Sequence, residues 1–115
     1  WSNADDMGKY LLMLLNNGIL PNGQQVITPE NLNYLREPRV YINAQNHSGL
    51  GWHIEDYQGL TVVHHPGGTV GYASELVLIP ELDVGFTLLS PDGYPTMTLT
   101  GDEATYQFRS LREPE

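Results

Sequence analysis

Apolar residues near the start of the chain recur at the spacing of one helical face. The stripe consists of Met7, Tyr10, Leu11, Leu14 and Leu15, and it is widened by Leu12 and Met13. This spacing predicts an amphipathic helix that packs deeply against the rest of the domain. Ser2, with Asp5 three residues later, predicts its N-cap, and Gly18 is the expected left-handed residue at its end.

A second, shorter helix is predicted to follow. Thr28 and Pro29 form an N-cap with a proline at the first helical position. This helix carries two leucines and ends before Pro38, because the residue before a proline disfavours helical backbone. Residues 39–48 show no clear period, so they are interpreted as a loop.

From Gly49 onwards the apolar period changes to that of a strand. Leu50, Trp52 and Ile54 alternate with other residues, which predicts a half-buried strand. Three further strands are predicted over residues 60–65, 75–79 and 84–89. Because short links join these strands, we expect an antiparallel meander of about four strands. Helices that are kept apart from such a sheet give an α+β fold.

The last part of the chain, residues 91–115, is less regular and is interpreted as a tail. Thr100, with Glu103 three residues later, predicts the N-cap of a final helix that reaches about Arg112. The chain has 115 residues, which suffice for one modest core and not for two. Residues 1–115 are therefore treated as one unit.

Composition excludes several classes of function. The formal net charge is −9, with only five Lys and Arg residues that form no patch, so a nucleic-acid partner is not expected. No apolar run approaches the length of a membrane span. The chain has no cysteine, which excludes disulfide and thiolate chemistry and leaves the cellular compartment undetermined.

Residues 64–74 hold the densest group of chemically special positions. Two histidines end an apolar run, and three glycines follow within seven residues. Glycines grouped in this way allow the backbone to approach a tight turn, a neighbouring strand or a bound substrate. A plain hairpin turn is the simplest alternative. Phosphate binding is disfavoured, because neither a helix start nor a lysine follows the glycines.

The four histidines also raise the question of a metal site. They are His47, His53, His64 and His65. Neither a His-Glu-x-x-His pattern nor a cysteine pair accompanies them, so we expect no metal. His64 and His65 are adjacent in a predicted strand and point to opposite faces, so only one of them can line a given site.

Three pieces of the chain stand in a distinctive order. They are the helix of residues 2–18, the strand Gly49-Leu50-Gly51-Trp52 and the segment His65-Pro66-Gly67-Gly68-Thr69-Val70-Gly71-Tyr72. Together they resemble the superfamily of β-lactamases, penicillin-binding proteins and serine esterases, in particular its class C-like branch. The helix is similar to the one between that family's second and third catalytic motifs. The last segment is similar to the third motif, Lys-Thr-Gly or His-x-Gly.

This resemblance implies roles for four residues, because the third-motif strand forms one wall of the family's active-site cleft. His65 takes the place of the motif's Lys or His, which leaves His64 a structural role. Gly67 keeps the wall free of a side chain, so that an acyl group can lie against it. The Gly68 N–H becomes the second oxyanion-hole donor, which makes His65 and Gly68 the candidate catalytic residues. Thr69 joins these three in the expected substrate-binding set.

The chain departs from the family pattern at its first two motifs. No serine is followed three residues later by a lysine, so the nucleophile's Ser-x-x-Lys motif is missing. Tyr41-Ile42-Asn43 has the letters of the second motif but follows the helix that it should precede, so it is interpreted as a chance match. We therefore expect residues 1–115 to be the C-terminal part of such a domain. The chain alone is expected to be inactive and to need the missing N-terminal half.

A further departure concerns the substrate. His65 and Pro66 stand where Lys and Thr or Ser bind the carboxylate of β-lactams and D,D-peptidase substrates. Proline offers no hydroxyl, and neutral histidine offers no fixed charge. We expect the intact enzyme to cleave an ester, lactone or amide, small or peptide-like, or else a β-lactam, through a serine acyl-enzyme and without a cofactor. The alternative is a non-catalytic relative that acts as a binding module.

Overall fold

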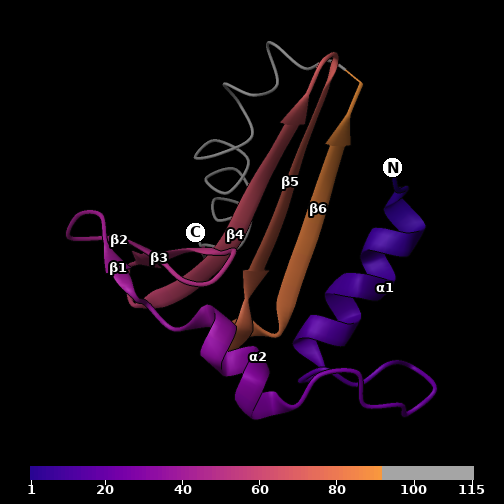
Figure 1. The fold of residues 1–115 in the computed structure, drawn as a ribbon, viewed down its shortest axis with the longest axis horizontal. Coiled ribbons are helices and arrows are strands. Elements are labelled where there is room, and N and C mark those ends of the chain that lie inside the picture. The colour runs from indigo at the N-terminus through magenta and orange to yellow at the C-terminus, as the bar shows by residue number, and fades with distance from the viewer. Residues whose placement is uncertain (92–115) are drawn as a thin grey trace, which may run out of the picture.

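The computed structural model describes residues 1–91, which form two helices and one six-stranded sheet (Figure 1). The elements, in chain order, are α1 (Ala4–Leu15), α2 (Pro29–Arg36), β1 (Val40–Tyr41), β2 (Asn46–Ser48), β3 (His53–Tyr57), β4 (Leu60–Thr69), β5 (Tyr72–Ile79), a 3-10 turn (Pro80–Leu82) and β6 (Val84–Ser90). Each strand pairs antiparallel with the next, in the order β1-β2-β3-β4-β5-β6. The expected α+β meander is confirmed. The helix expected near residues 100–112 lies outside the described residues.

Helix α1 begins one residue later than the capping pattern suggested. Its N-cap is Asn3 rather than Ser2, and the Asn3 side chain accepts a hydrogen bond of 3.0 Å from the Asp6 N–H. Asparagine and serine are both good caps, and here Asn3 has the extended backbone that a cap needs. At the other end Gly18 has a φ of 84°, as expected of a residue that leaves a helix.

The apolar stripe of α1 is buried only in part. Leu11, Met13 and Leu14 lie in the core, whereas Leu12 is 51% exposed. The second helix starts as expected, because the Thr28 hydroxyl accepts a hydrogen bond from the N–H of Asn31. Its leucine at position 32 is fully buried.

Besides the later start of β3, at His53 instead of near Gly49, which leaves Leu50 46% exposed, the sheet differs from the expected one in two places. Residues 39–48, expected to be a loop, contain the short strands β1 and β2, so the meander has six strands instead of about four. Neither strand shows an alternating burial pattern, which is why no period is visible in that part of the sequence. The second difference is that Gly67 and Gly68 lie inside β4, which continues to Thr69. Only Gly71, with a φ of 80°, lies in the hairpin turn.

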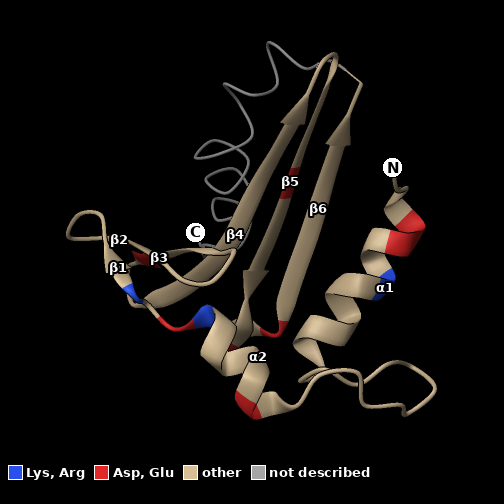
Figure 2. Cartoon of the chain, viewed as in Figure 1, with Lys and Arg blue, Asp and Glu red and all other residues tan. Residues whose placement is uncertain are grey.

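Both faces of the sheet carry apolar residues. Val63 and Leu78 pack with the helix residues on one face, whereas Val62 and Val77 form a second cluster on the other face. Helix α1 runs alongside β6, and α2 lies at the base of the long strands (Figure 1). Charges avoid this centre: Glu75 of β5 is the one Asp, Glu, Lys or Arg of strands β4 to β6, and Figure 2 shows these strands largely in the colour of uncharged residues.

Candidate functional site

One edge of β4 is open beyond the end of β3. Strand β3 pairs with β4 only as far as the His53–His64 pair. From His65 to Thr69, β4 pairs with β5 on one side, and no described strand pairs with it on the other. The segment expected to form the site therefore has a free strand edge.

The register decides which backbone groups reach this edge. Thr69 and Tyr72 flank the two-residue turn at 70–71, so they form a hydrogen-bonded pair. Hydrogen-bonded and non-bonded pairs alternate along an antiparallel ladder, so residues 66 and 68 direct their backbone groups away from β5. Because Pro66 has no N–H, the Gly68 N–H is the one amide donor that residues 65–69 direct toward the open edge.

Gly67 lies on the face of the sheet that carries α1, directly opposite Ser74. A Cβ atom at Gly67 would collide with the Ser74 hydroxyl. Because Gly67 has no side chain, the Ser74 hydroxyl fits against the backbone of β4 at this position.

His65 is exposed, and its Nδ1 lies 2.6 Å from the carbonyl oxygen of Pro66. Since a carbonyl oxygen only accepts, Nδ1 carries the proton of this hydrogen bond and Nε2 is the second ring nitrogen available to a ligand. His64 points to the opposite face, where its Nδ1 lies 3.2 Å from the Glu75 carboxylate. The two adjacent histidines therefore have separate environments, as expected from the period of the strand.

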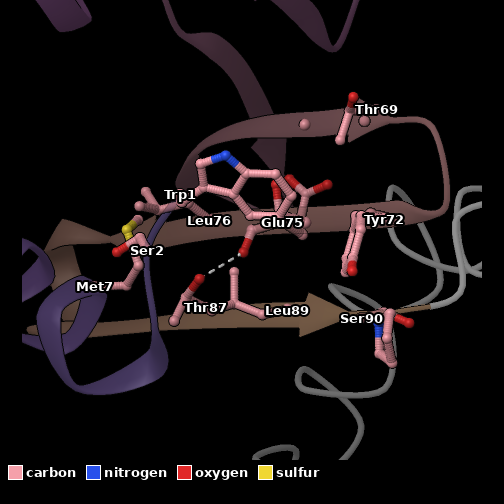
Figure 3. A pocket seen from close by; sticks show the side chains of 15 residues that line it. Trp1, Ser2, Met7, Thr69, Tyr72, Glu75, Leu76, Thr87, Leu89 and Ser90 are labelled. Atoms are coloured by element: carbon pink, nitrogen blue, oxygen red, sulfur yellow. Dashed lines mark hydrogen bonds between the residues drawn. The ribbon is translucent and has the colours of Figure 1, made fainter.

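A groove of about 680 Å³ follows the β4–β5 hairpin (Figure 3). Gly67, Gly68 and Thr69 form part of one side. Its remaining lining is largely apolar and aromatic, and includes Trp1, Met7, Tyr72 and Leu89. No lysine or arginine of the described residues lines the groove. Its contacts therefore suit an uncharged, apolar group.

His65 lines an adjoining hollow of about 360 Å³ rather than the groove itself. Gly67 and Ser74 line both spaces, so the two meet beside the open edge of β4. The structure thus brings all four expected residues, His65, Gly67, Gly68 and Thr69, to one continuous surface.

Several residues of this surface were not expected from the sequence. Ser74 has no role assigned from the sequence, yet it lies over Gly67 and borders both hollows. Its position depends on the pairing register, which the two-residue turn at 70–71 sets. A count back from that turn would have paired Ser74 with Gly67. Tyr72, whose ring meets Trp1 edge-on at 5.6 Å, had no comparable signal.

His53, the first residue of β3, has a pKa that differs from its ordinary value. Burial, followed by the charges of His64 and His65, lowers the pKa of His53 below its ordinary value. Its ring centre lies 5.4 Å from that of each of these two histidines. Among residues 1–91, no group of three or more His, Asp or Glu side chains has the geometry of a metal site. In the same residues, neither helix has the length and apolar character needed to cross a membrane.

Comparisons with known proteins show the family of the chain. The Beta-lactamase family model matches residues 1–107. The chain is 30% identical to unguisins hydrolase ungD' of Aspergillus campestris over 93 residues, which are 77% of this chain and 16% of that protein.

Two solved structures share the fold. The octameric penicillin-binding protein homologue from Pyrococcus abyssi superimposes with a TM-score of 0.73 at 24% identity, over 96% of this chain and 24% of its own. The penicillin binding protein from Bacillus halodurans gives a TM-score of 0.70 at 17% identity, over 94% of this chain and 30% of its own. The chain therefore spans less than a third of each of these relatives.

Proposed function

Because the chain belongs to the beta-lactamase family, we propose that it supplies one wall of the active-site groove of a serine hydrolase that works through an acyl-enzyme. The observation that carries this proposal is the single amide donor, Gly68 N–H, at the open edge of β4. In acyl transfer a backbone N–H aimed at the developing oxyanion stabilises the transition state. The nucleophilic serine of the longer protein would attack the substrate carbonyl beside this edge.

The hydrogen bonds of His65 favour a supporting role for this residue. Its Nδ1–H is held by the Pro66 carbonyl, so Nε2 is the atom that can accept from, or donate to, a substrate. We infer that His65 contacts the substrate next to the scissile bond. Gly67 and Thr69 both line the groove in which the acyl group would lie.

The lining of the groove favours a substrate without an anionic group. Neither Pro66 nor the lining residues provide a fixed positive charge, and the apolar side chains suit an apolar acyl or side-chain group. An ester, lactone or amide of this kind is the proposed substrate class. One relative, unguisins hydrolase ungD', is itself named as a hydrolase.

A labelling experiment separates this proposal from a non-catalytic binding module. The longer protein that contains this chain is treated with a fluorophosphonate probe, which forms a covalent bond with an activated serine. We expect labelling of that protein, faster cleavage of apolar aryl esters than of penicillin-type substrates, and no labelling of residues 1–115 alone. A longer protein that is folded but stays unlabelled would favour the binding module.

A further inference from the structure

Glu75 is a charged residue in an apolar place. It lies in the middle of β5 and is 1% exposed, and it is the single charged residue of strands β4 to β6 (Figure 2). It pairs with Pro66 across the ladder, directly behind the segment that borders the groove. A buried carboxylate is costly unless a partner compensates it, so this residue requires an explanation.

The compensating group is His64. Its Nδ1 lies 3.2 Å from Oε1 of Glu75, and both side chains are largely removed from solvent. Within the described part of the chain, Oε2 of the same carboxylate has no hydrogen-bond partner. The contact with His64 therefore offsets part of the cost of burying this carboxylate.

The contact matters for the groove because the next part of β4 lacks polar side chains. Pro66, Gly67 and Gly68 have no side chain that can hold β4 to β5 by a polar contact. Cross-strand side-chain pairs stabilise the register of a ladder. The His64–Glu75 pair is therefore the polar side-chain contact between the two strands nearest to this bare segment.

The same pair is also linked to the groove by a row of rings. The ring of His53 lies 5.4 Å from that of His64, at an interplanar angle of 35°, and 5.4 Å from that of His65, at 39°. Other titratable groups near this row are Glu55, on the same face of β3, and Tyr10 of α1, which borders the hollow of His65. Strand β6 places Leu88 opposite Glu75 and so adds no charge there.

Charge repulsion limits how many of these rings can be protonated together. Burial and the charges of the two neighbouring histidines lower the pKa of His53, while the charge of Glu75 acts in the opposite direction. The charges of His64 and Glu75 therefore both act on His53, which lies beside the start of the open segment of β4.

We propose that Glu75 is a positioning residue of the active-site wall: its contact with His64 holds the His65–Gly68 segment in register, and the charges of this pair act on His53 beside the same segment. The importance of that segment rests on the proposed function, but the pairing itself does not. Its test therefore needs no catalytic activity, and a failure of the hydrolase proposal would leave it standing.

The test measures the pKa of His53 by NMR in the longer protein that contains this chain and in two variants of it. We expect Glu75→Gln to lower this pKa further, because a negative charge is lost, and His64→Gln to raise it, because a positive charge is lost. Glu30→Gln, which removes an exposed carboxylate on α2, is the control and should leave it unchanged. An unchanged pKa of His53 in both variants would overturn the proposal.

Amide hydrogen exchange provides the positional readout. The Gly67 N–H belongs to a pair that is hydrogen-bonded to β5, so its protection reports how firmly the bare segment is held. Loss of a charged hydrogen bond should speed its exchange by at least about tenfold in Glu75→Gln. Exchange at the amides of α2 serves as the comparison, and equal exchange at Gly67 in both proteins would contradict the positioning role.

If Glu75→Gln does not fold, a double variant without either charge allows the same pKa measurement. His64→Phe combined with Glu75→Leu replaces the pair by apolar groups, which buried sites often accept without loss of stability. The pKa of His53 should then rise, since the charge of His64 acts on it more strongly than that of Glu75. A value equal to that of the unmodified chain would overturn the proposal.

Discussion

At the scale of single residues, Gly67 and Ser74 form a pair in which one side chain occupies the space that the other lacks. A methyl group at Gly67 would displace the Ser74 hydroxyl, so the two positions should be energetically coupled. We expect Gly67→Ala to lower the free energy of unfolding by at least about 0.5 kcal/mol more in the unmodified chain than in the Ser74→Ala variant. Denaturant unfolding of the four proteins measures this coupling, and equal costs in both backgrounds would contradict it.

His53 gives a prediction about pH. Burial and the neighbouring histidine charges lower its pKa in the folded chain, whereas in the unfolded chain it has its ordinary value of 6.5. Between these two values the unfolded chain binds more protons, so the free energy of unfolding rises as the pH rises through this window. His53→Gln should flatten the rise. Urea unfolding at a series of pH values on both sides of 6.5 measures it, with His47→Gln as a control that keeps the rise.

At the scale of elements, the start of α1 distinguishes two neighbouring caps. The Asn3 side chain accepts from the Asp6 N–H, whereas the Ser2 hydroxyl makes no such contact. We expect Asn3→Ala to destabilise the chain by about 1 kcal/mol and Ser2→Ala to have little effect. Thermal or urea unfolding decides between them. A larger loss of stability from Ser2→Ala than from Asn3→Ala would contradict this assignment and identify Ser2 as the N-cap.

The elements that the sequence predicted well are those with a strong period. The stripe from Met7 to Leu15 predicted α1, although it is buried only in part, and the apolar runs predicted the long strands β4 to β6. Strands β1 and β2 were missed, because strands of two and three residues with no buried face leave no periodic signal. The glycines were expected to end a strand, yet pairing with β5 carries β4 through them. Backbone pairing does not depend on side chains, so composition alone could not reveal this.

Part of the candidate site could also be predicted from the sequence. The resemblance pointed to His65 and Gly68, and the period of the strand separated His64 from His65. The partner of His64 was not predicted, since Glu75 is eleven residues away and its position depends on the register that the 70–71 turn sets. The direction of the Gly68 N–H depends on the same register, and so does its freedom from β5.

At the scale of the whole molecule, the described residues leave large apolar side chains exposed. They include Trp1, Leu12, Val70, Tyr72, Leu88 and Leu89. With an open edge of β4 beside some of them, we expect the 115-residue chain to associate or to be only marginally stable. Sedimentation velocity at several concentrations tests this, together with a thermal melt. A monomer at all concentrations with a sharp cooperative melt would contradict it.

The central claim is that the Gly68 amide, directed to the open edge of β4, donates a hydrogen bond to the substrate oxygen. Gly68→Pro removes this donor without removing a ladder hydrogen bond, and Gly68→Ala keeps it. The most direct measurement is kcat for an apolar aryl ester with the longer protein and these two variants. We expect Gly68→Pro to lower kcat by about a hundredfold or more and Gly68→Ala to stay close to the unmodified protein. A folded Gly68→Pro variant with unchanged kcat would contradict the account.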